Sequence, residues 1–428
     1  MSAAEPATRP EIGPLAVLLS RFPSVTETFI LREVVELDRA GVDVVFVPLL
    51  REPPPPVLHP EAVAWDRRAL YTPFVNGPIL AANARVFVSR PWLWLRTLLA
   101  LLAESVTSWN AFSGTLGIYL KSVYYGQELR ARGVCHIHAH FATHPTTAAY
   151  VMSRVRRAGD REIPYSLTVH AHDIFLHTAG LARKLAGASF VRTISEFNAE
   201  FLLERFASGR FAVTREKFQV IHCGIEPSRY ASRPLAGAPG RDRPARLLSV
   251  AQLKPYKGIA FLIEAARRLV EQGVDLCCDV IGGGPLHAEL EAAIARAGLG
   301  ERFHLLGPRT QSEVAEALAS ADLFVLPSIV AADGQMEGIP VSLMEALAAG
   351  VPTVATRLSG IPELVRDGRT GYVVPPGDAE SLAAAIARAL AEPERAHALA
   401  QAGRVLVQEE FEIRGCMQRL VDAVSRAQ

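Results

Sequence analysis

The sequence predicts an α/β protein with two doubly wound, Rossmann-like domains that face each other across a cleft. Strand-like apolar runs alternate with amphipathic helical runs along almost all of the 428 residues, as in parallel sheets covered by helices on both faces. At roughly 100–200 residues per domain, this length suits two or three folding units. The alternation therefore favours two domains, each built around its own parallel sheet.

The first domain is expected at residues 1–232. Its six strands are predicted at 15–20, 42–49, 134–141, 165–171, 190–195 and 218–223. The stretch from about 53 to 130 opens with a run of prolines, continues through Trp- and Leu-rich sequence, and is expected to be a helical insertion. Its apolar residues and arginines suit packing on the domain, which is favoured, or contact with a membrane surface.

The second domain is expected at residues 245–410. It follows a Pro-, Gly- and Arg-rich stretch at 232–246, which we interpret as the interdomain linker. Its strands are predicted within 247–252, 277–283, 303–307, 323–328, 353–356 and 372–375. Open sheets of this kind bind ligands at the carboxyl ends of their strands, so the candidate site residues are sought there.

Charge and cysteine content exclude several classes of protein. The chain has 45 Lys and Arg against 44 Asp and Glu, so no overall field attracts nucleic acid, which is not expected as a partner. Its five cysteines form no CxxC pair and indicate neither a disulfide framework nor a thiolate zinc site. The first residues lack a signal-peptide pattern, and no apolar run is long enough to span a bilayer. We expect a cytoplasmic protein, with peripheral contact to the cytoplasmic face of the membrane as the alternative.

The most informative segment is 333–356, which follows a predicted strand. Proline suits the first turn of a helix and glycine the residue after its end, so a helix is expected to begin at Ile339 and Pro340 and to end near Gly350. Unpaired amides and the positive end of the helix dipole would make its N-terminus an anion site suited to a diphosphate. The residues expected to form this anion site are Gly338, Ile339, Pro340 and Val341.

Two carboxylates flank this anion site, at Glu337 and Glu345. If both lay on the helix, its rise of about 1.5 Å per residue would separate them by roughly 12 Å. Glycosidase carboxylate pairs lie about 5–9.5 Å apart, so hydrolysis by this pair is disfavoured. The spacing suits the two ends of one ligand, a sugar at one glutamate and a ribose at the other.

A third element, 250–258, joins the first strand of the second domain to its first helix. Lys257 at this turn would neutralise a departing phosphate as a point charge, against the plainer alternative of a solvated lysine. The glycine-rich stretch at 280–290 has His287 where a dinucleotide fingerprint needs glycine, so nicotinamide binding is not expected.

Histidines gather on two predicted strands of the first domain. His136, His138 and His140 alternate and so share one face, as metal ligands would. His170, His172 and Asp173 follow the next strand. Polar groups lining the cleft are favoured over a metal site, and no DxD sequence offers a carboxylate pair for a metal and a diphosphate.

In order and spacing, these segments resemble the family-4 glycosyltransferases of the GT-B fold, especially the bacterial exopolysaccharide branch, over nearly the whole chain. The segments that carry the resemblance are RFPSVTETFILREV (21–34), HAHFAT (138–143), TVHAHDIF (168–175), ISEFNAEFL (194–202), HCGIEPSRY (222–230), VAQLKPYKG (250–258), DGQMEGIPVSLMEALAAGVPTVAT (333–356) and SGIPELVRDGRTGYVVPPGD (359–378).

The resemblance implies retaining transfer of a sugar from a nucleotide-diphosphate sugar to an acceptor hydroxyl, without a cofactor or essential metal. The acceptor implied is a glycan or a polyprenyl-diphosphate-linked intermediate. It also implies that the last helix, 411–428, crosses back to complete the first domain.

The resemblance also assigns roles to residues. The implied catalytic residues are His170, Lys257 and Glu337, with His170 near the reacting carbon. The implied donor-binding residues are Gln252, Lys257, Glu337, Gly338, Ile339, Pro340, Val341 and Glu345. The candidate acceptor or cleft residues are Thr26, Glu27, His140, His172 and Asp173.

The chain departs from the family pattern at two places. Gln252 stands where the family usually has arginine, and Ser359 with Gly360 replaces a pair of glycines. The alternatives at this point are an epimerase or phosphorylase-like enzyme on the same fold, a metal-dependent hydrolase using the HxH strand, and a silent subunit that binds sugar nucleotides.

Overall fold

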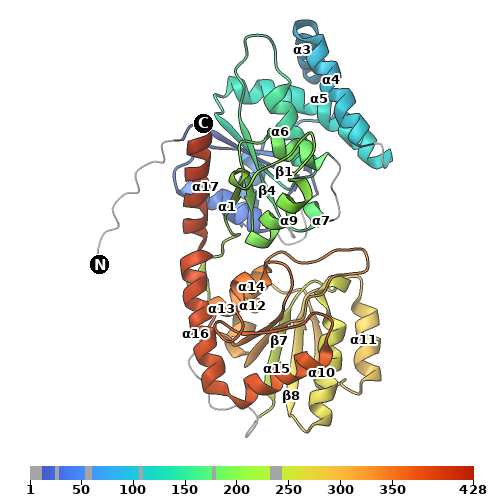
Figure 1. Ribbon diagram of the computed structural model, residues 1–428, viewed down its shortest axis with the longest axis vertical. Coiled ribbons are helices and arrows are strands. Elements are labelled where there is room, and N and C mark those ends of the chain that lie inside the picture. Colours follow the sequence, from blue (N-terminus) through green and yellow to red (C-terminus); the bar gives the residue numbers. More distant parts are fainter. Residues whose placement is uncertain (1–11, 25–27, 54–59, 106–108, 176–179, 232–242) are drawn as a thin grey trace, which may run out of the picture. The chain divides into compact units, whose positions relative to one another are not determined.

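The computed structural model describes residues 12–24, 28–53, 60–105, 109–175, 180–231 and 243–428. Its strands form two six-stranded sheets in which all paired strands run parallel. Each predicted strand is present, within a few residues of its expected position. The predicted doubly wound α/β class is confirmed for both sheets (Figure 1).

The first sheet has the strand order β2-β1-β3-β4-β5-β6. Its strands are β1 (Leu15–Phe22), β2 (Val44–Arg51), β3 (His136–His140), β4 (Tyr165–Val169), β5 (Val191–Thr193) and β6 (Phe218–Val220). The β3 and β4 strands are buried along their whole length, because helices cover both faces of a parallel sheet. Histidine side chains in β3 therefore lie in the interior.

The helices of this half are α1 (Thr28–Arg39), α2 (Pro60–Arg68), α3 (Gly77–Ser89), α4 (Pro91–Glu104), α5 (Trp109–Ala131), α6 (His144–Arg154), α7 (His172–Phe175), α8 (Leu181–Gly187) and α9 (Glu196–Phe206). Short 3-10 turns follow at η1 (Arg215–Lys217) and η2 (Pro227–Arg229).

The second sheet has the order β12-β11-β10-β7-β8-β9. Its strands are β7 (Ala245–Val250), β8 (Leu276–Ile281), β9 (Phe303–Gly307), β10 (Leu323–Leu326), β11 (Thr353–Thr356) and β12 (Tyr372–Val374). The turns and helices of this half are η3 (Pro255–Lys257), α10 (Ile259–Glu271), α11 (His287–Arg296), α12 (Gln311–Ser320), α13 (Val341–Ala348), α14 (Ile361–Leu364), α15 (Ala379–Ala391) and α16 (Pro393–Glu410). The last helix of the chain is α17 (Ile413–Ala427).

The predicted insertion is helical, and its parts differ in burial. Helix α5 packs on α6 and adds Tyr125 and Leu129 to the hydrophobic core, which the packing alternative predicts. Helices α3 and α4 contact α5 and each other but leave large apolar side chains exposed. The exposed apolar side chains of this region are Val63, Phe74, Val75, Leu80, Phe87, Val88, Trp92, Leu95, Leu99 and Leu116.

Within the described residues, no one helix has both the length and the apolar composition needed to cross a bilayer. Helices α3 and α4 satisfy both criteria only when taken together, and the chain bends by 115° between them.

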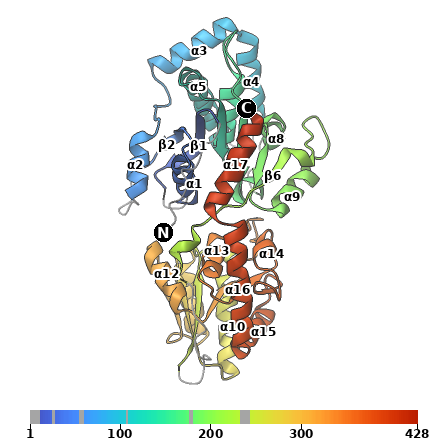
Figure 2. The ribbon, with the colours of Figure 1, turned by 90° about the vertical axis from the view of Figure 1, so that its left-hand side faces the viewer.

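The chain divides into two compact units. Unit 1 comprises Met1–Ile194, Asn198–Ile221 and Cys416–Gln428, and unit 2 comprises Ser195–Phe197 and His222–Gly415. The change of unit at Ile221 precedes the boundary expected at 232, and most of the predicted linker, 232–242, lies outside the described residues. Helix α17, which follows α16 in red in Figure 2, carries the chain back to unit 1.

Candidate functional site

In unit 2, the turn after β7 places Lys257 at the end of η3. Gly258 follows with a φ of 67°, and a Cβ at this position would lie 1.9 Å from the Pro327 carbonyl oxygen. Only glycine fits this left-handed position so close to another backbone. Gln252 is half-buried in the same turn, where its carbonyl accepts a hydrogen bond from the Lys254 amide.

Lys257 and Glu337 form an ion pair, although they come from different segments of unit 2. Both side chains are largely withdrawn from solvent, with exposed fractions of 12% and 11%. Ser359 holds the Glu337 segment in place, because its Oγ donates to the carbonyl oxygens of Glu337 at 2.6 Å and Gly338 at 3.0 Å. The serine that departs from the family pattern thus anchors a predicted site segment.

Helix α13 begins at Val341, later than predicted, with Pro340 as its N-cap and no capping side chain. Glu337 therefore lies in the loop before the helix and Glu345 lies within it, so the axial separation expected for two helical carboxylates does not apply. The first amides of a helix have no partner inside it. The helix start next to Glu337 can therefore receive an anion.

Glu345 is buried on α13 and is held by a residue that the sequence did not single out. The Tyr230 hydroxyl donates to Glu345 Oε1 at 2.7 Å, and Gln311 Nε2 lies 3.3 Å from the same hydroxyl. Tyr230 is the last residue of the HCGIEPSRY segment. The contact could not be predicted from the sequence, because Tyr230 and Glu345 lie far apart along the chain.

In unit 1, four of the predicted histidines, His136, His138, His140 and His170, lie in the interior and do not line an open surface. His138 is hydrogen-bonded with Ser166 Oγ at 2.8 Å and with Thr168 Oγ1 at 2.7 Å. His140 stacks on His170, with ring centroids 5.9 Å apart. These rings are buried within the unit. The expectation that the rings line a cleft therefore does not match the structure.

Burial keeps these imidazoles neutral. Desolvation lowers the pKa of His136 and of His140 to about 3. It lowers the pKa of His138 and of His170 well below the usual value, and neighbouring histidines and Arg192 add to the effect. Arg192 forms a buried bidentate pair with Glu33, at 2.7 and 2.8 Å, so the cationic group in this interior is itself paired.

Asp173 is fully buried, and its carboxylate holds backbone segments of unit 1 together. Its two carboxylate oxygens accept hydrogen bonds from the backbone amides of Ala142 at 2.7 Å and His170 at 2.9 Å. Desolvation raises the pKa of Asp173 to about 6, against the lowering effect of these amides and Lys184. The carboxylate thus fixes the backbone where β3 and β4 end, which differs from the acceptor contact expected for it.

The remaining candidates are only partly described. Thr26 and Glu27 lie outside the described residues. His172 begins α7, and its side chain is not among those described. Among the described residues, the one group of side chains that could hold a metal ion is Cys277, Asp279 and His304, so the HxH metal site that was considered as the alternative is not found among them.

The sequence of unit 2 matches the family model described as glycosyl transferases group 1, over residues 238–406. A GDP-mannose-dependent alpha-(1-6)-phosphatidylinositol monomannoside mannosyltransferase from Mycolicibacterium smegmatis is 30% identical over 280 residues, which cover 63% of this chain and 72% of that protein. The chain belongs to the group 1 glycosyltransferases. The family resemblance expected from the motifs is confirmed.

Two further proteins, one relative in sequence and one solved structure, extend the comparison. The amylovoran biosynthesis glycosyltransferase AmsK of Erwinia amylovora is 40% identical over 211 residues, 49% of this chain and 51% of that protein, so the chain spans about half the length of this relative. The crystal structure of Anabaena Alr3699/HepE in complex with UDP matches with a TM-score of 0.69 at 18% identity, over 97% of this chain and 100% of that one. That likeness shows the fold.

Proposed function

We propose that the chain is a retaining glycosyltransferase that moves a sugar from a nucleotide-diphosphate sugar to an acceptor hydroxyl. The observation that carries the proposal is the Lys257–Glu337 ion pair beside the start of α13, with Glu345 held on the same helix by Tyr230. The group 1 family and the UDP bound in the Anabaena structure support a nucleotide-sugar donor.

The charged groups of unit 2 would act on the diphosphate and the sugar of a bound donor. A diphosphate at the start of α13 would face the helix dipole and the Lys257 ammonium, which stabilise negative charge as it develops on the leaving group. Lys257 would then exchange part of its pairing with Glu337 for the diphosphate. The Glu337 carboxylate would become available to accept hydrogen bonds from hydroxyls of the donor sugar.

Glu345 would bind the ribose of the same donor. A carboxylate accepts several hydrogen bonds, so Glu345 can accept one from a ribose hydroxyl as well as the one from Tyr230. A buried carboxylate that is held by a tyrosine keeps one orientation, which lowers the entropic cost of binding.

We propose further that no metal ion is required for the transfer. Lys257 and the helix start already supply positive charge where a diphosphate would leave. The role near the reacting carbon that the family resemblance implies for His170 stays a prediction.

A thermal-shift screen against UDP, GDP, ADP and TDP, each with and without EDTA, tests the donor proposal. Binding to the native state alone raises the melting temperature, so one nucleotide should stabilise the wild type equally with and without chelator. Glu345→Ala should abolish that shift, and Tyr230→Phe should weaken affinity roughly tenfold, because it loses one buried hydrogen bond to a charged group. Tyr124→Phe in unit 1 is the matched control.

Turnover separates a transferase from a protein that only binds the donor. Lys257→Ala should lower kcat by about 10²–10³-fold, the usual effect of removing one group that stabilises a developing negative charge. Wild-type turnover in Lys257→Ala would contradict the mechanism. Binding of a nucleotide sugar with no transfer in the wild type would favour the silent-subunit alternative.

A separate observation supports the proposal of a lipid-linked acceptor. Val88 on α3 is 82% exposed, and Trp92 on α4 is 81% exposed. Two exposed arginines lie on the same helices, Arg85 on α3 and Arg96 on α4. Apolar side chains beside basic ones suit the surface of an anionic bilayer. The name of one relative, a phosphatidylinositol monomannoside mannosyltransferase, supports a lipid-linked acceptor. We propose that this acceptor is a polyprenyl-diphosphate-linked intermediate or a similar lipid at the cytoplasmic face of the membrane.

Sedimentation with phosphatidylglycerol vesicles tests this membrane contact. The wild type should bind these vesicles better than phosphatidylcholine vesicles. The double variant Val88→Asp with Trp92→Ala should bind at least about tenfold more weakly, because two apolar side chains no longer enter the interface. Val405→Asp changes an exposed valine on α16 and should leave binding unchanged. Equal sedimentation of all three proteins would exclude this role for α3 and α4.

A further inference from the structure

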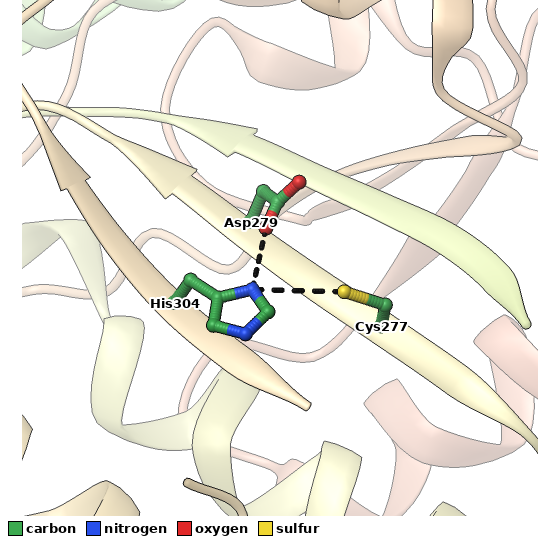
Figure 3. Close-up of side chains that lie close together, drawn as sticks. All are labelled: Cys277, Asp279 and His304. Carbon is green, nitrogen blue, oxygen red and sulfur yellow. Dashed lines mark hydrogen bonds and ion pairs between the residues drawn. The ribbon is translucent and has the colours of Figure 1, made fainter. Parts of the chain in front are cut away.

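Three side chains of different chemistry meet on one face of the β8–β9 strand pair. Cys277 and Asp279 lie two positions apart on β8, so both point to the same side of the sheet. His304 on β9 stands directly opposite Asp279 in the parallel register. Figure 3 shows the three side chains pointing toward one another from these two strands.

The separations of their donor atoms suit a tetrahedral metal ion. His304 Nδ1 lies 3.6 Å from Cys277 Sγ and 2.9 Å from Asp279 Oδ1. With zinc bonds of about 2.3 Å to sulfur and about 2.05 Å to nitrogen, tetrahedral angles place the two ligand atoms roughly 3.5 Å apart. The nitrogen and oxygen would need to separate by a few tenths of an ångström, which rotation of the 40% exposed Asp279 side chain permits.

We propose that Cys277, Asp279 and His304 bind a divalent transition-metal ion of the zinc class, with water as the fourth ligand. Thiolate, imidazole and carboxylate together suit Zn²⁺ and its spectroscopic substitute Co²⁺ better than Mg²⁺ or Ca²⁺, which prefer oxygen ligands. On binding, the thiol proton of Cys277 leaves to solvent, and sulfur and Nδ1 each donate an electron pair to the metal.

A nucleophilic role for the cysteine fits these contacts less well. A catalytic triad needs the thiol on one imidazole nitrogen and the carboxylate on the other, whereas here both face Nδ1. Burial and the Asp279 charge also raise the pKa of the Cys277 thiol, which lowers the fraction of nucleophilic thiolate.

The site is separate from the proposed donor site. Cys277 and His304 are each the second residue of their strand, near its amino end, whereas Gln252 and Lys257 follow the carboxyl end of β7. Because β9 is the edge strand of its sheet, an ion held here would tie that edge to β8. The inference thus concerns stability of unit 2, and it holds or fails independently of the transferase proposal.

Cobalt titration of the chelator-treated full chain tests the site. One equivalent of Co²⁺ should give the thiolate-to-cobalt charge-transfer band and the intense visible bands of a tetrahedral ion, and Zn²⁺ should displace it. Cys277→Ser and His304→Asn should lose this spectrum, and Asp279→Asn should bind at least about tenfold more weakly, since a protein ligand is lost. Cys135→Ser changes another half-exposed cysteine and should keep the spectrum.

Protection from alkylation provides a second measurement on the wild type. Zn²⁺ should slow the reaction of Cys277 with iodoacetamide, read by mass spectrometry, and leave that of Cys135 unchanged. Absence of a tetrahedral cobalt spectrum in the wild type, its persistence in a folded Cys277→Ser variant, or equal alkylation of Cys277 with and without Zn²⁺ would each overturn the proposal.

Discussion

Individual residues show why some site positions follow from sequence and others do not. Lys257 and Glu337 were predicted, because a charge beside a glycine near the start of a helix is a local pattern, and Glu345 was predicted from its short spacing to Glu337. Tyr230 and Ser359 were missed, because each acts through a contact with a segment distant in sequence. The Cys277–Asp279–His304 group was also missed, since it depends on which residue of β9 stands opposite Asp279.

The buried histidines of unit 1 make its stability depend on pH. Their pKa values are lowered in the folded state, so the unfolded chain binds protons first as the pH falls below about 6.5. The stability that neutral histidine provides is thus present above pH 6.5 and lost toward pH 3. Each of them adds up to about 1.4 kcal/mol per pH unit to the slope. Asp173, whose pKa is raised to about 6, changes the stability in the opposite direction. It is a single group, whereas four histidines have lowered pKa values, so the effect of the histidines is larger.

We therefore expect His136→Phe to flatten the acid limb of the stability curve. Phenylalanine can stack on Phe190 as His136 does, but it takes up no proton. The free energy of unfolding between pH 6 and 4.5, measured by urea titration, should fall less steeply by about 1.4 kcal/mol per pH unit. A slope in His136→Phe equal to that of the wild type would show that His136 is charged in the folded state.

At the scale of elements, the strands were predicted because parallel strands read as apolar runs between turn residues. The start of α13 was placed too early, since proline suits the N-cap as well as the first turn and the sequence does not distinguish them. The burial of the HxH strand was also missed. Histidine is polar, and the contacts that satisfy both nitrogens of His138 in the interior come from Ser166 and Thr168 on the neighbouring strand β4.

The turn between β7 and α10 leads to a second prediction, for Gly258→Ala. A Cβ there would meet the Pro327 carbonyl oxygen at 1.9 Å, whereas Gly273 has a φ of 83° and nothing within 4 Å. Gly273→Ala should therefore cost about 1–2 kcal/mol of unfolding free energy for the left-handed backbone alone. Gly258→Ala should cost about 1–3 kcal/mol more and weaken nucleotide binding, because the backbone that carries Lys257 must shift. Equal losses in urea unfolding would mean that the close approach is relieved without strain.

At the scale of the whole molecule, the unit to which a residue belongs depends on the path of the chain and not only on the residue's position in the sequence. Unit 2 takes in Ser195–Phe197, and unit 1 takes in the far end of the chain from Cys416 onward. The expected boundary at 232 relied on Pro and Gly content, which marks irregular backbone, whereas the contacts already change at Ile221. Ile225 in fact bridges to Glu412, a pairing between distant residues that composition cannot reveal.

This chain path predicts that a change in α17 destabilises unit 1 selectively. Leu420 is 1% exposed and lies in a stretch assigned to unit 1, together with the buried Met417, Val421 and Val424. Leu420→Ala should cost about 2–5 kcal/mol, the usual range for a leucine removed from a core. Gln418→Ala, at an exposed position of the same helix, should stay within about 0.5 kcal/mol of the wild type.

Hydrogen exchange followed by mass spectrometry resolves the two units in one experiment. In Leu420→Ala, exchange should accelerate in β1 to β6, although these strands lie two hundred or more residues away in sequence. It should stay unchanged in β7 to β12, which are nearer to Leu420 along the chain, because opening of one unit need not open the other. The nucleotide-induced thermal shift should also persist, since the proposed donor site belongs to unit 2. Uniform acceleration across both sheets would instead show that the units unfold as one cooperative body.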